Sequence, residues 1–382
     1  MDADGLCANK LSVPLRRRLA DEMVVVAVKQ IIMNFRKINS VFGICLLAVV
    51  LLTVTAPAGA QKLRVAAVGF YNLENLFDTI NQPDVNDEDF TPKGSYQYSP
   101  DRYIFKLNRL SEVISQVGRD VDPKGLMVIG VSEIENRSVL EDLVRTEKLR
   151  PMNLGVVHFD GPDRRGVDVG MLYRQDLFRV LSARSVRLHT PEDTAFRTRD
   201  QLVVTGTFDG DTLHVIVNHW PSRSGGEERS APKRIAAAQL TRHCVDSLYR
   251  IYPRAKIVVM GDLNDDPTNV SVTEHLGAVG KTGNLEKQGL FNPMWKLYKD
   301  GVGSLAYQDS WNLFDQLIVS EPLVNDRIGY RFLRANVFNK PFLLQKEGSF
   351  KGYPWRTYVG SAFKGGYSDH LPTYIVLVKE VQ

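Results

Sequence analysis

The sequence predicts a single α/β domain with many strands, and three observations support this prediction. From about residue 63 onward, apolar stretches typical of buried strands alternate with stretches whose apolar residues recur at helical spacing. The chain has 382 residues, of which 43% are hydrophobic and 24% are charged, as in ordinary globular proteins. It contains no internal repeat, low-complexity tract or long linker. One domain with a substantial core therefore accounts for residues 61–382.

Residues 1–60 are expected to be an N-terminal extension with a signal peptide. Arg36 and Lys37 precede an uncharged apolar run at residues 41–54, and small residues follow as far as Ala60. This order is typical of secretory signals. The run is shorter than the roughly 20 apolar residues of a membrane helix, so an uncleaved anchor is the less favoured alternative. We predict cleavage after Ala60 and a secreted or periplasmic protein.

Charge and cysteine content narrow the function classes. The formal net charge is +4, but after residue 60 the chain has 41 basic and 40 acidic residues. A near-neutral body excludes the strong overall positive field that drives tight non-specific binding to nucleic acid, although it allows a local basic patch. Cys244 is the lone cysteine after residue 60, so we expect a small buried side chain and no internal disulfide. A start at Met33 instead of Met1 fits the sequence equally well.

Eight segments carry the apolar patterns of strands. In chain order they are residues 63–72, 126–133, 166–173, 201–208, 212–220, 256–264, 314–320 and 370–378. The fourth and fifth segments alternate around the sequence FDGD, which predicts a β-hairpin.

Three helices are expected between these strands. The apolar residues of segment 102–117 recur at helical spacing, which predicts an amphipathic helix. Asn136 is suited to cap a second helix that ends near residue 149. A third helix is predicted for residues 230–248, where a serine opens the segment and a proline falls near the first turn.

Polar residues repeatedly stand at the ends of the apolar strands. They are Asn72, Glu74, Glu133, Asp168, Asn218, His219, Asp262, Asn264, Asp315, Asp369 and His370. A carboxylate at the mouth of a buried strand must bind a cation, accept hydrogen bonds or shift its pKa. Converging carboxylates and amides favour a hard, oxygen-ligated ion such as Mg²⁺, with Mn²⁺ as the alternative. Zinc is disfavoured because the histidines are scattered and no paired cysteines exist.

Each of these signals has a structural alternative when it is taken alone. Glu133 is equally compatible with a hydrogen-bonded carboxylate at a strand end, and His219 with a packed histidine. Asp168 is explained as well by an ion pair with Arg164 or Arg165 as by a function. The prediction of a site therefore depends on the ordered set.

In this order, the motifs resemble those of the metal-dependent endonuclease/exonuclease/phosphatase superfamily. The resemblance extends from FYNLEN (70–75) through EIEN, NHWPSR and GDLN to SDHLP (368–372), nearly the whole chain after residue 60. NLENLFD and RRGVDVGMLY look like a secreted bacterial branch. The resemblance implies a four-layer α/β/β/α sandwich, in which two mixed β-sheets face each other, helices lie outside and the site lies at one edge. It also implies a metal-dependent phosphoric ester hydrolase.

The resemblance further implies roles for individual residues. The residues implied for metal binding are Glu133, Asn72, Asp369 and Glu74. The residues implied for catalysis are His219, Asp262, Asn264, Asp315 and His370. Asp262 is expected to orient or deprotonate the attacking water, and Asp315 is expected to keep His370 oriented and charged. Substrate contacts are expected from Asn218, beside the first histidine, and from two basic residues, Arg223 and Arg356.

The expected substrate is nucleic acid, because of the segment 337–367. It contains one Glu, eight aromatic residues and five basic residues, namely Lys340, Lys346, Lys351, Arg356 and Lys364. Basic groups neutralise phosphates while aromatic rings stack on bases. The same composition suits a phosphorylated small molecule or a lipid headgroup, which would indicate a phosphatase or phospholipase C-type enzyme. It also suits a folded flap that buries its aromatic residues. No protein partner is implied.

Overall fold

The structure is a computed structural model that describes residues 63–190 and 193–381. The chain divides into two units, residues 1–61 and residues 62–382, and the fold below is that of the second unit. The predicted signal peptide and its cleavage site after Ala60 lie outside the described residues.

The first sheet has six strands. Their order is β14 (Arg331–Val337), β17 (Thr373–Glu380), β1 (Leu63–Leu76), β2 (Val128–Ile134), β4 (Asp168–Arg174) and β3 (Leu154–His158). β1 and β2 are parallel, and the other neighbours are antiparallel, so the sheet is mixed.

The second sheet has seven strands and is also mixed. Their order is β5 (Arg179–Val186), β6 (Gln201–Phe208), β7 (Asp211–His219), β8 (Ile257–Asp262), β13 (Asp315–Ser320), β10 (Leu290–Phe291) and β9 (Ala278–Val279). β7 and β8 are parallel, whereas β6 and β7 form the predicted hairpin. Two small hairpins lie outside both sheets, β11 (Leu305–Tyr307) with β12 (Ser310–Asn312) and β15 (Tyr358–Val359) with β16 (Ala362–Phe363).

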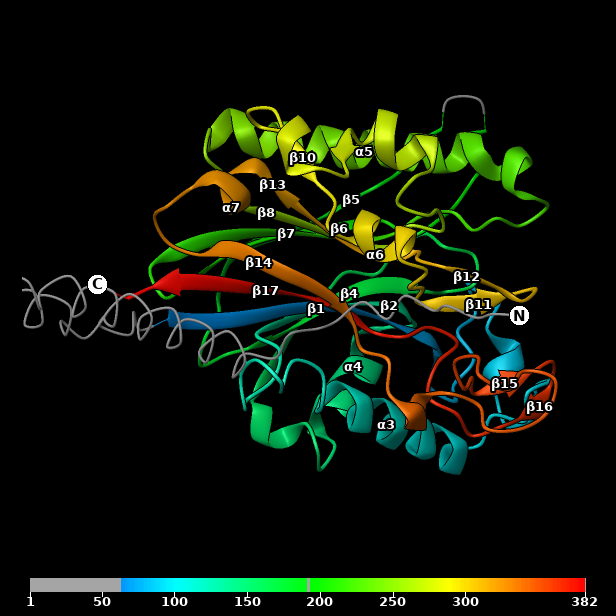
Figure 1. The fold of residues 1–382 in the computed structure, drawn as a ribbon. Helices are drawn as coiled ribbons and strands as arrows, with labels where there is room; N and C mark the ends of the chain where they lie inside the picture. The colour runs from blue at the N-terminus through cyan, green and yellow to red at the C-terminus, as the bar shows by residue number, and fades with distance from the viewer. Residues whose placement is uncertain (1–62, 191–192, 382) are drawn as a thin grey trace, which may run out of the picture. The chain divides into compact units, whose positions relative to one another are not determined.

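Helices cover the outer faces of the two sheets (Figure 1). α3 (Pro100–Ile114) and α4 (Arg137–Arg145) lie against the first sheet, and α5 (Glu227–Ile251) lies against the second. The shorter helices are α6 (Met294–Lys299), α7 (Glu321–Asn325), η1 (Glu88–Phe90), η2 (Arg150–Met152), η3 (Ser271–His275), η4 (Thr282–Asn284) and η5 (Pro341–Leu343). Separate apolar clusters fill the space between the sheets and the space under the helices on each side. The predicted α/β/β/α sandwich is therefore confirmed.

Local signals explain where the helices begin. Asn136 caps α4 as predicted, because its side chain accepts a hydrogen bond from the Val139 N–H at 3.1 Å. α5 begins three residues before the predicted Ser230, and two glutamates occupy its first turn, where the helix dipole favours negative charge. Cys244, on this helix, is buried as expected, and burial raises the pKa of its thiol.

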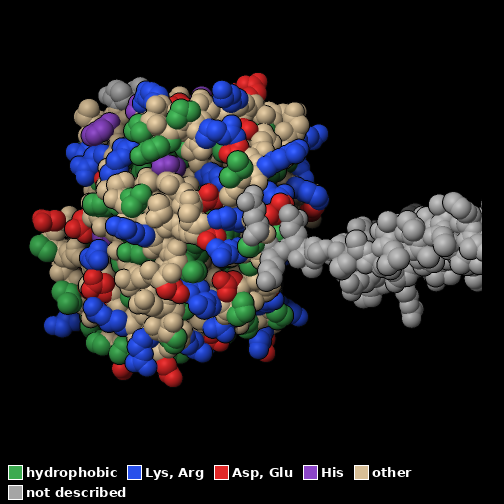
Figure 2. Space-filling model, turned by 90° about the vertical axis from the view of Figure 1, so that its left-hand side faces the viewer, with side chains coloured by type: hydrophobic (Ala, Val, Ile, Leu, Met, Phe, Trp, Pro, Cys, Tyr) green, Lys and Arg blue, Asp and Glu red, His purple; other side chains and the backbone are tan. Residues whose placement is uncertain are grey.

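On the end of the molecule shown in Figure 2, Lys and Arg side chains are interspersed with Asp and Glu, and hydrophobic side chains are scattered among them. Among the described residues, no helix combines the length and the apolar character needed to span a bilayer.

Candidate active site

Strand register brings the predicted residues of the second sheet into one row. His219 at the end of β7 pairs with Asp262 at the end of β8, and Asp262 pairs with Asp315 at the start of β13. On the first sheet, β1 carries Asn72 opposite Ser132, the residue before Glu133. The two sheets thus bring their polar ends together at one edge of the sandwich.

The backbone is strained at this edge. Glu74, Asn75, Glu133 and Asn264 have φ angles of 47°, 54°, 57° and 50°, in the left-handed region that side chains other than glycine rarely adopt. Strained backbone of this kind clusters at functional sites, where the surrounding structure holds it. Here the turns direct the side chains away from the strand ladder and toward one another.

One part of the site contains carboxylates that lack a Lys or Arg partner in the described chain. We call Glu133, Asp262, His219 and Asn72 the Glu133 half. The Asn72 amide donates hydrogen bonds to Glu133 Oε1 at 3.3 Å and to Asp262 Oδ2 at 3.1 Å. His219 Nε2 lies 3.9 Å from the first of these oxygens and 3.6 Å from the second. The amide oxygen of Asn72 accepts from the backbone N–H of Glu74, so Asn72 orients the carboxylates through its nitrogen.

A histidine–aspartate pair adjoins the Glu133 half. His370 Nδ1 lies 2.6 Å from Asp315 Oδ2, and the other ring nitrogen of His370 lies 3.8 Å from Asp262 Oδ2. The Ser304 hydroxyl also donates to Asp315 Oδ2. Asn264, by contrast, donates its side-chain amide to the Trp220 carbonyl at 2.9 Å, and its backbone N–H donates to Asp262 Oδ1 at 2.9 Å.

These groups have shifted pKa values. Burial raises the pKa of Asp262 to about 7, with the Asp315 carboxylate adding to the rise and His370 opposing it. Burial alone would lower the pKa of His370, but the Asp315 and Asp262 carboxylates hold it well above its usual value. Burial lowers the pKa of His219 well below its usual value, with help from Arg199 and Arg165. One histidine is therefore charged and the other neutral near pH 7.

The other part of the site contains its own cations. We call Glu74, Asp369, Lys106 and Arg356 the Glu74 half. Glu74 Oε2 lies 3.8 Å from Lys106 Nζ and accepts the Thr357 backbone N–H at 2.6 Å. Glu74 Oε1 lies 3.4 Å from Arg356 Nε, and the same guanidinium bonds Asp369.

The pKa values of the Glu74 half reflect this pairing. Burial, with the Asp369 carboxylate nearby, raises the pKa of Glu74 to about 7, although both cations oppose the rise. Burial lowers the pKa of Lys106, and Glu74 opposes that fall. Burial alone would raise the pKa of Asp369, but His370 and Arg356 hold it below its usual value.

Two of the residues predicted to contact the substrate, Asn218 and Arg223, form hydrogen bonds with other groups of the same chain. The Asn218 amide donates to the carbonyls of Ile216 and Met260 and accepts from Trp220 and Thr241, so it braces β7 against β8 and α5. The Arg223 guanidinium bonds the Asn264 carbonyl, Glu227, Asp265 and Asn269. The structure therefore does not support a substrate contact for Asn218 or Arg223. Arg356 does lie in the site, with 41% of its side chain exposed.

Sequence reasoning missed residues whose partners are distant in the chain. Lys106 is 1% exposed and lies on the buried face of α3, one turn before Leu110. A lysine among the apolar positions of a predicted helix is the sequence feature that could have identified it. Arg199 was also missed; it donates to the Trp220 carbonyl at 2.5 Å and pairs with Asp163 at 3.2 Å. Because that carbonyl directly follows His219, Arg199 supports the end of β7.

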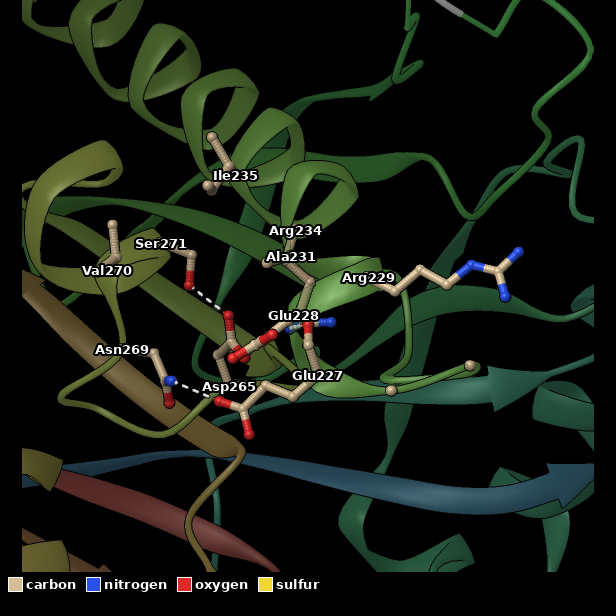
Figure 3. A pocket seen from close by; sticks show the side chains of 12 residues that line it. Glu227, Glu228, Arg229, Ala231, Arg234, Ile235, Asp265, Asn269, Val270 and Ser271 are labelled. Atoms are coloured by element: carbon tan, nitrogen blue, oxygen red, sulfur yellow. Dashed lines mark hydrogen bonds and ion pairs between the residues drawn. The ribbon is translucent and has the colours of Figure 1, made fainter.

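Two features near the site do not join it. Asp168 pairs with His158 at 3.2 Å, instead of with an arginine. Figure 3 shows a pocket of about 670 Å³ beside the start of α5, where Ser271 donates to Asp265 at 2.6 Å and Asn269 donates to Glu227 at 3.0 Å. The guanidinium of Arg229 points away from these groups. Four polar residues of this pocket, Ser271, Asp265, Asn269 and Glu227, thus bond one another in pairs.

The donor set of the Glu133 half suits a divalent cation. Glu133, His219 and Asp262 each offer a ligand atom, and these atoms lie within 4.8 Å of one another. The Glu133 side chain is 16% exposed, which leaves the group open to solvent on one side. The carboxylates of Asp262, which is buried, and Glu133, which is partly buried, have a neutral amide and a neutral histidine beside them, and this leaves negative charge that a cation would balance.

The matching family model is described as the endonuclease/exonuclease/phosphatase family and covers residues 67–379. The chain belongs to this family. Enzymes of the family are divalent-metal-dependent, and the chain is accordingly a phosphoric ester hydrolase. Comparison with curated protein sequences gave no significant match.

Comparison with solved structures gave similar structures at low sequence identity. Humanized D. rerio TDP2 has a TM-score of 0.50 at 12% identity, over 82% of this chain and 98% of that one. An endonuclease/exonuclease/phosphatase family protein from Bacteroides thetaiotaomicron has a TM-score of 0.49 at 18% identity, over 84% and 100%. A mannosyl-6-phosphatase from the same organism has a TM-score of 0.48 at 16% identity, over 82% and 99%.

Proposed function

We propose that the protein is a secreted, Mg²⁺-dependent phosphodiesterase that hydrolyses phosphodiester bonds of nucleic acid. The observation that carries this proposal is the Glu133 half beside the His370–Asp315 pair. It places carboxylates without a Lys or Arg partner next to a charged histidine, and phosphoester hydrolysis needs both kinds of group.

The chain's own residues divide the chemistry as follows. Glu133, which Asn72 orients, would hold the cation, and the cation would neutralise charge on the phosphate oxygens. Asp262, with a pKa of about 7, accepts the proton of the attacking water. The His370 imidazolium, held by Asp315, stabilises charge at the phosphorus centre. Asn72 fixes the two carboxylates, and Asn264 fixes the turn after β8.

Exposed lysines support a polyanionic substrate. Lys340, Lys346, Lys351 and Lys364 are exposed on the segment that leads to His370. Several aromatic residues of this segment are buried or packed against the core, as in the folded-flap alternative. The proposal of a nucleic-acid substrate therefore depends on the lysines. The proposal of secretion depends on the apolar run 41–54 and the basic residues before it. The assignment to a secreted bacterial branch of the family depends on motifs such as RRGVDVGMLY.

A second candidate is a phosphatase or phospholipase C-type enzyme that acts on inositol phosphates or sphingomyelin-like lipids. The observation that favours a smaller substrate is the occupied state of Arg223 and the burial of the aromatic residues, which leave fewer groups to bind an extended strand.

The test is an assay of purified protein, beginning at Gln61, with Mg²⁺ or Mn²⁺ against plasmid DNA, RNA, sphingomyelin and inositol phosphates. Asp262→Asn and EDTA serve as controls for contaminating enzymes. The proposal expects metal-dependent cleavage of DNA or RNA. Hydrolysis of sphingomyelin or inositol phosphates without nucleic-acid cleavage would establish the second candidate instead. Mass spectrometry of the exported protein should find Gln61 as the first residue.

A further inference from the structure

A small cavity of about 170 Å³ lies directly beside the Glu74 half. Its lining combines the charged groups of that half with aromatic rings, and consists of Glu74, Asn75, Phe90, Tyr96, Tyr98, Lys106, Arg356, Thr357, Tyr358 and Gly360. Pockets for drug-sized ligands usually measure about 300–1,000 Å³, so this cavity has room for a single ring.

Aromatic side chains from two distant segments form one side of the lining. The ring centroids of Phe90 and Tyr96 are 4.8 Å apart, and those of Tyr96 and Tyr358 are 4.9 Å apart in an edge-to-face arrangement. The Tyr358 hydroxyl donates to the Tyr96 carbonyl at 3.2 Å, which ties the loop before α3 to the β15–β16 hairpin. Rings fixed in this way offer a preformed contact surface.

Hydrogen-bonding groups form the other side. Lys106 Nζ donates to the Thr357 hydroxyl at 2.7 Å and lies 3.8 Å from Glu74. An ammonium has three donors, and among the described residues this one makes a single hydrogen bond, to Thr357. Arg356, which bridges Glu74 and Asp369, also lines the cavity. The cavity therefore offers donors and acceptors within reach of an aromatic face.

We propose that this cavity binds the sugar ring that carries the scissile phosphate, through aromatic contact with the ring and hydrogen bonds to its hydroxyls. A sugar ring presents C–H faces and hydroxyl groups together, which matches a lining of tyrosines with an ammonium, a hydroxyl and a carboxylate. The inference rests on the proposed function, because it assumes that the phosphate is held at the adjacent Glu133 half. A free sugar phosphate and a nucleotide share this chemistry.

Binding is measured by calorimetry in the full chain carrying Asp262→Asn, with Mg²⁺ present, so that hydrolysis does not interfere. The ligands are glucose 6-phosphate, thymidine 5′-monophosphate and the ring-free glycerol 3-phosphate. We expect at least one ring-bearing phosphate to bind about 10-fold tighter than glycerol 3-phosphate. Tighter binding of glucose 6-phosphate would indicate a free sugar phosphate as the ligand, and tighter binding of thymidine 5′-monophosphate would indicate a nucleotide.

Adding Tyr96→Ala should abolish that preference, and Tyr96→Leu serves if the alanine variant is unstable. Tyr252→Ala, at a half-exposed tyrosine outside the cavity, should leave the preference unchanged. Equal binding of all three phosphates, no detectable binding of either ring-bearing one, or a preference that survives both Tyr96 variants would overturn the inference. Hydrolysis by the wild-type protein is assayed separately, so failure of the proposed function remains distinguishable.

Discussion

The two halves of the site place similar carboxylates in opposite electrostatic settings. In the Glu74 half, Lys106 and Arg356 lie against the carboxylates, so the protein balances its own charge. In the Glu133 half, no Lys or Arg within the described ranges pairs with Glu133 or Asp262. The Glu74 half therefore balances its own charge, whereas the Glu133 half needs a bound cation to balance its charge.

This contrast predicts that breaking the Glu74 half chiefly costs stability. Lys106→Met leaves Glu74 without its buried lysine, and removal of one partner of a buried ion pair typically costs about 3–5 kcal/mol. Urea unfolding of the metal-free protein measures the loss. Changing both partners, Lys106→Met with Glu74→Gln, should recover most of it, because the glutamine has no unbalanced charge and its amide oxygen can still accept the Thr357 N–H. A loss below about 1 kcal/mol in the single variant would contradict a structural network.

Breaking the Glu133 half should instead cost activity. Glu133→Gln removes a charge that has no Lys or Arg partner, so the free energy of unfolding of the metal-free protein should not fall. The kcat should drop by about 10²–10³-fold and calorimetry should show weaker Mg²⁺ binding. Glu135→Gln is a matched control, because Glu135 lies two residues further and bonds Asp78 and Gln82 instead. Unchanged Mg²⁺ binding in the Glu133 variant would remove it from the metal site.

The groups proposed to act on the reacting phosphate should affect kcat more than KM. Asp262→Asn and His370→Ala should each lower kcat by about 10²-fold, because their contribution arises in the transition state. His158→Ala is the control, since His158 makes a similar pair with Asp168 outside both halves. Near-normal kcat in either site variant, or an equal loss in the control, would exclude the assigned role.

The Asp315–His370 pair should determine the alkaline limit of activity. The two neighbouring carboxylates raise the pKa of His370, so the imidazolium persists to higher pH than in a free histidine. Asp315→Asn removes one of them, and the alkaline limb of the pH–rate profile should therefore move to lower pH. The stability that this pair contributes is present below the unfolded pKa and is lost as pH rises through the folded pKa. An alkaline limb that stays in place would show that another group sets it.

Buried strands could be predicted from the sequence, whereas strands at the sheet edges could not. Each of the eight predicted strands is present, because continuous apolar runs identify strands that are covered on one or both faces. β5 and β14 were missed because they lie at sheet edges and contain no buried apolar run. The helix expected to reach residue 149 ends at Arg145, where Thr146 leaves the helical conformation.

The site could be predicted where the position of a residue along its strand determines which side chains it meets. Residues at the ends of neighbouring strands meet at one edge, so His219, Asp262 and Asp315 could be grouped from their order alone. The pairing of Lys106 with Glu74 could not, because it depends on how α3 packs across the end of β1. Which side chains from distant segments come into contact depends on tertiary packing, and the sequence pattern does not predict it.

The smallest expected effect tests whether the exposed lysines of segment 337–367 contact the substrate. Lys346 and Lys351 are exposed and have no ion-pair partner among the described residues, whereas Arg356 is tied into the Glu74 half. If the two lysines neutralise phosphates, changing both to Glu should weaken DNA binding and reduce the slope of log K against log salt by about 1 per lysine. Unfolding free energy should stay within about 0.5 kcal/mol. Lys281→Glu with Lys287→Glu makes the same charge change on the exposed segment between β9 and β10 and should leave the slope unchanged. An equal change of slope in both pairs would mean that only net charge matters and that the segment 337–367 makes no phosphate contact through these lysines.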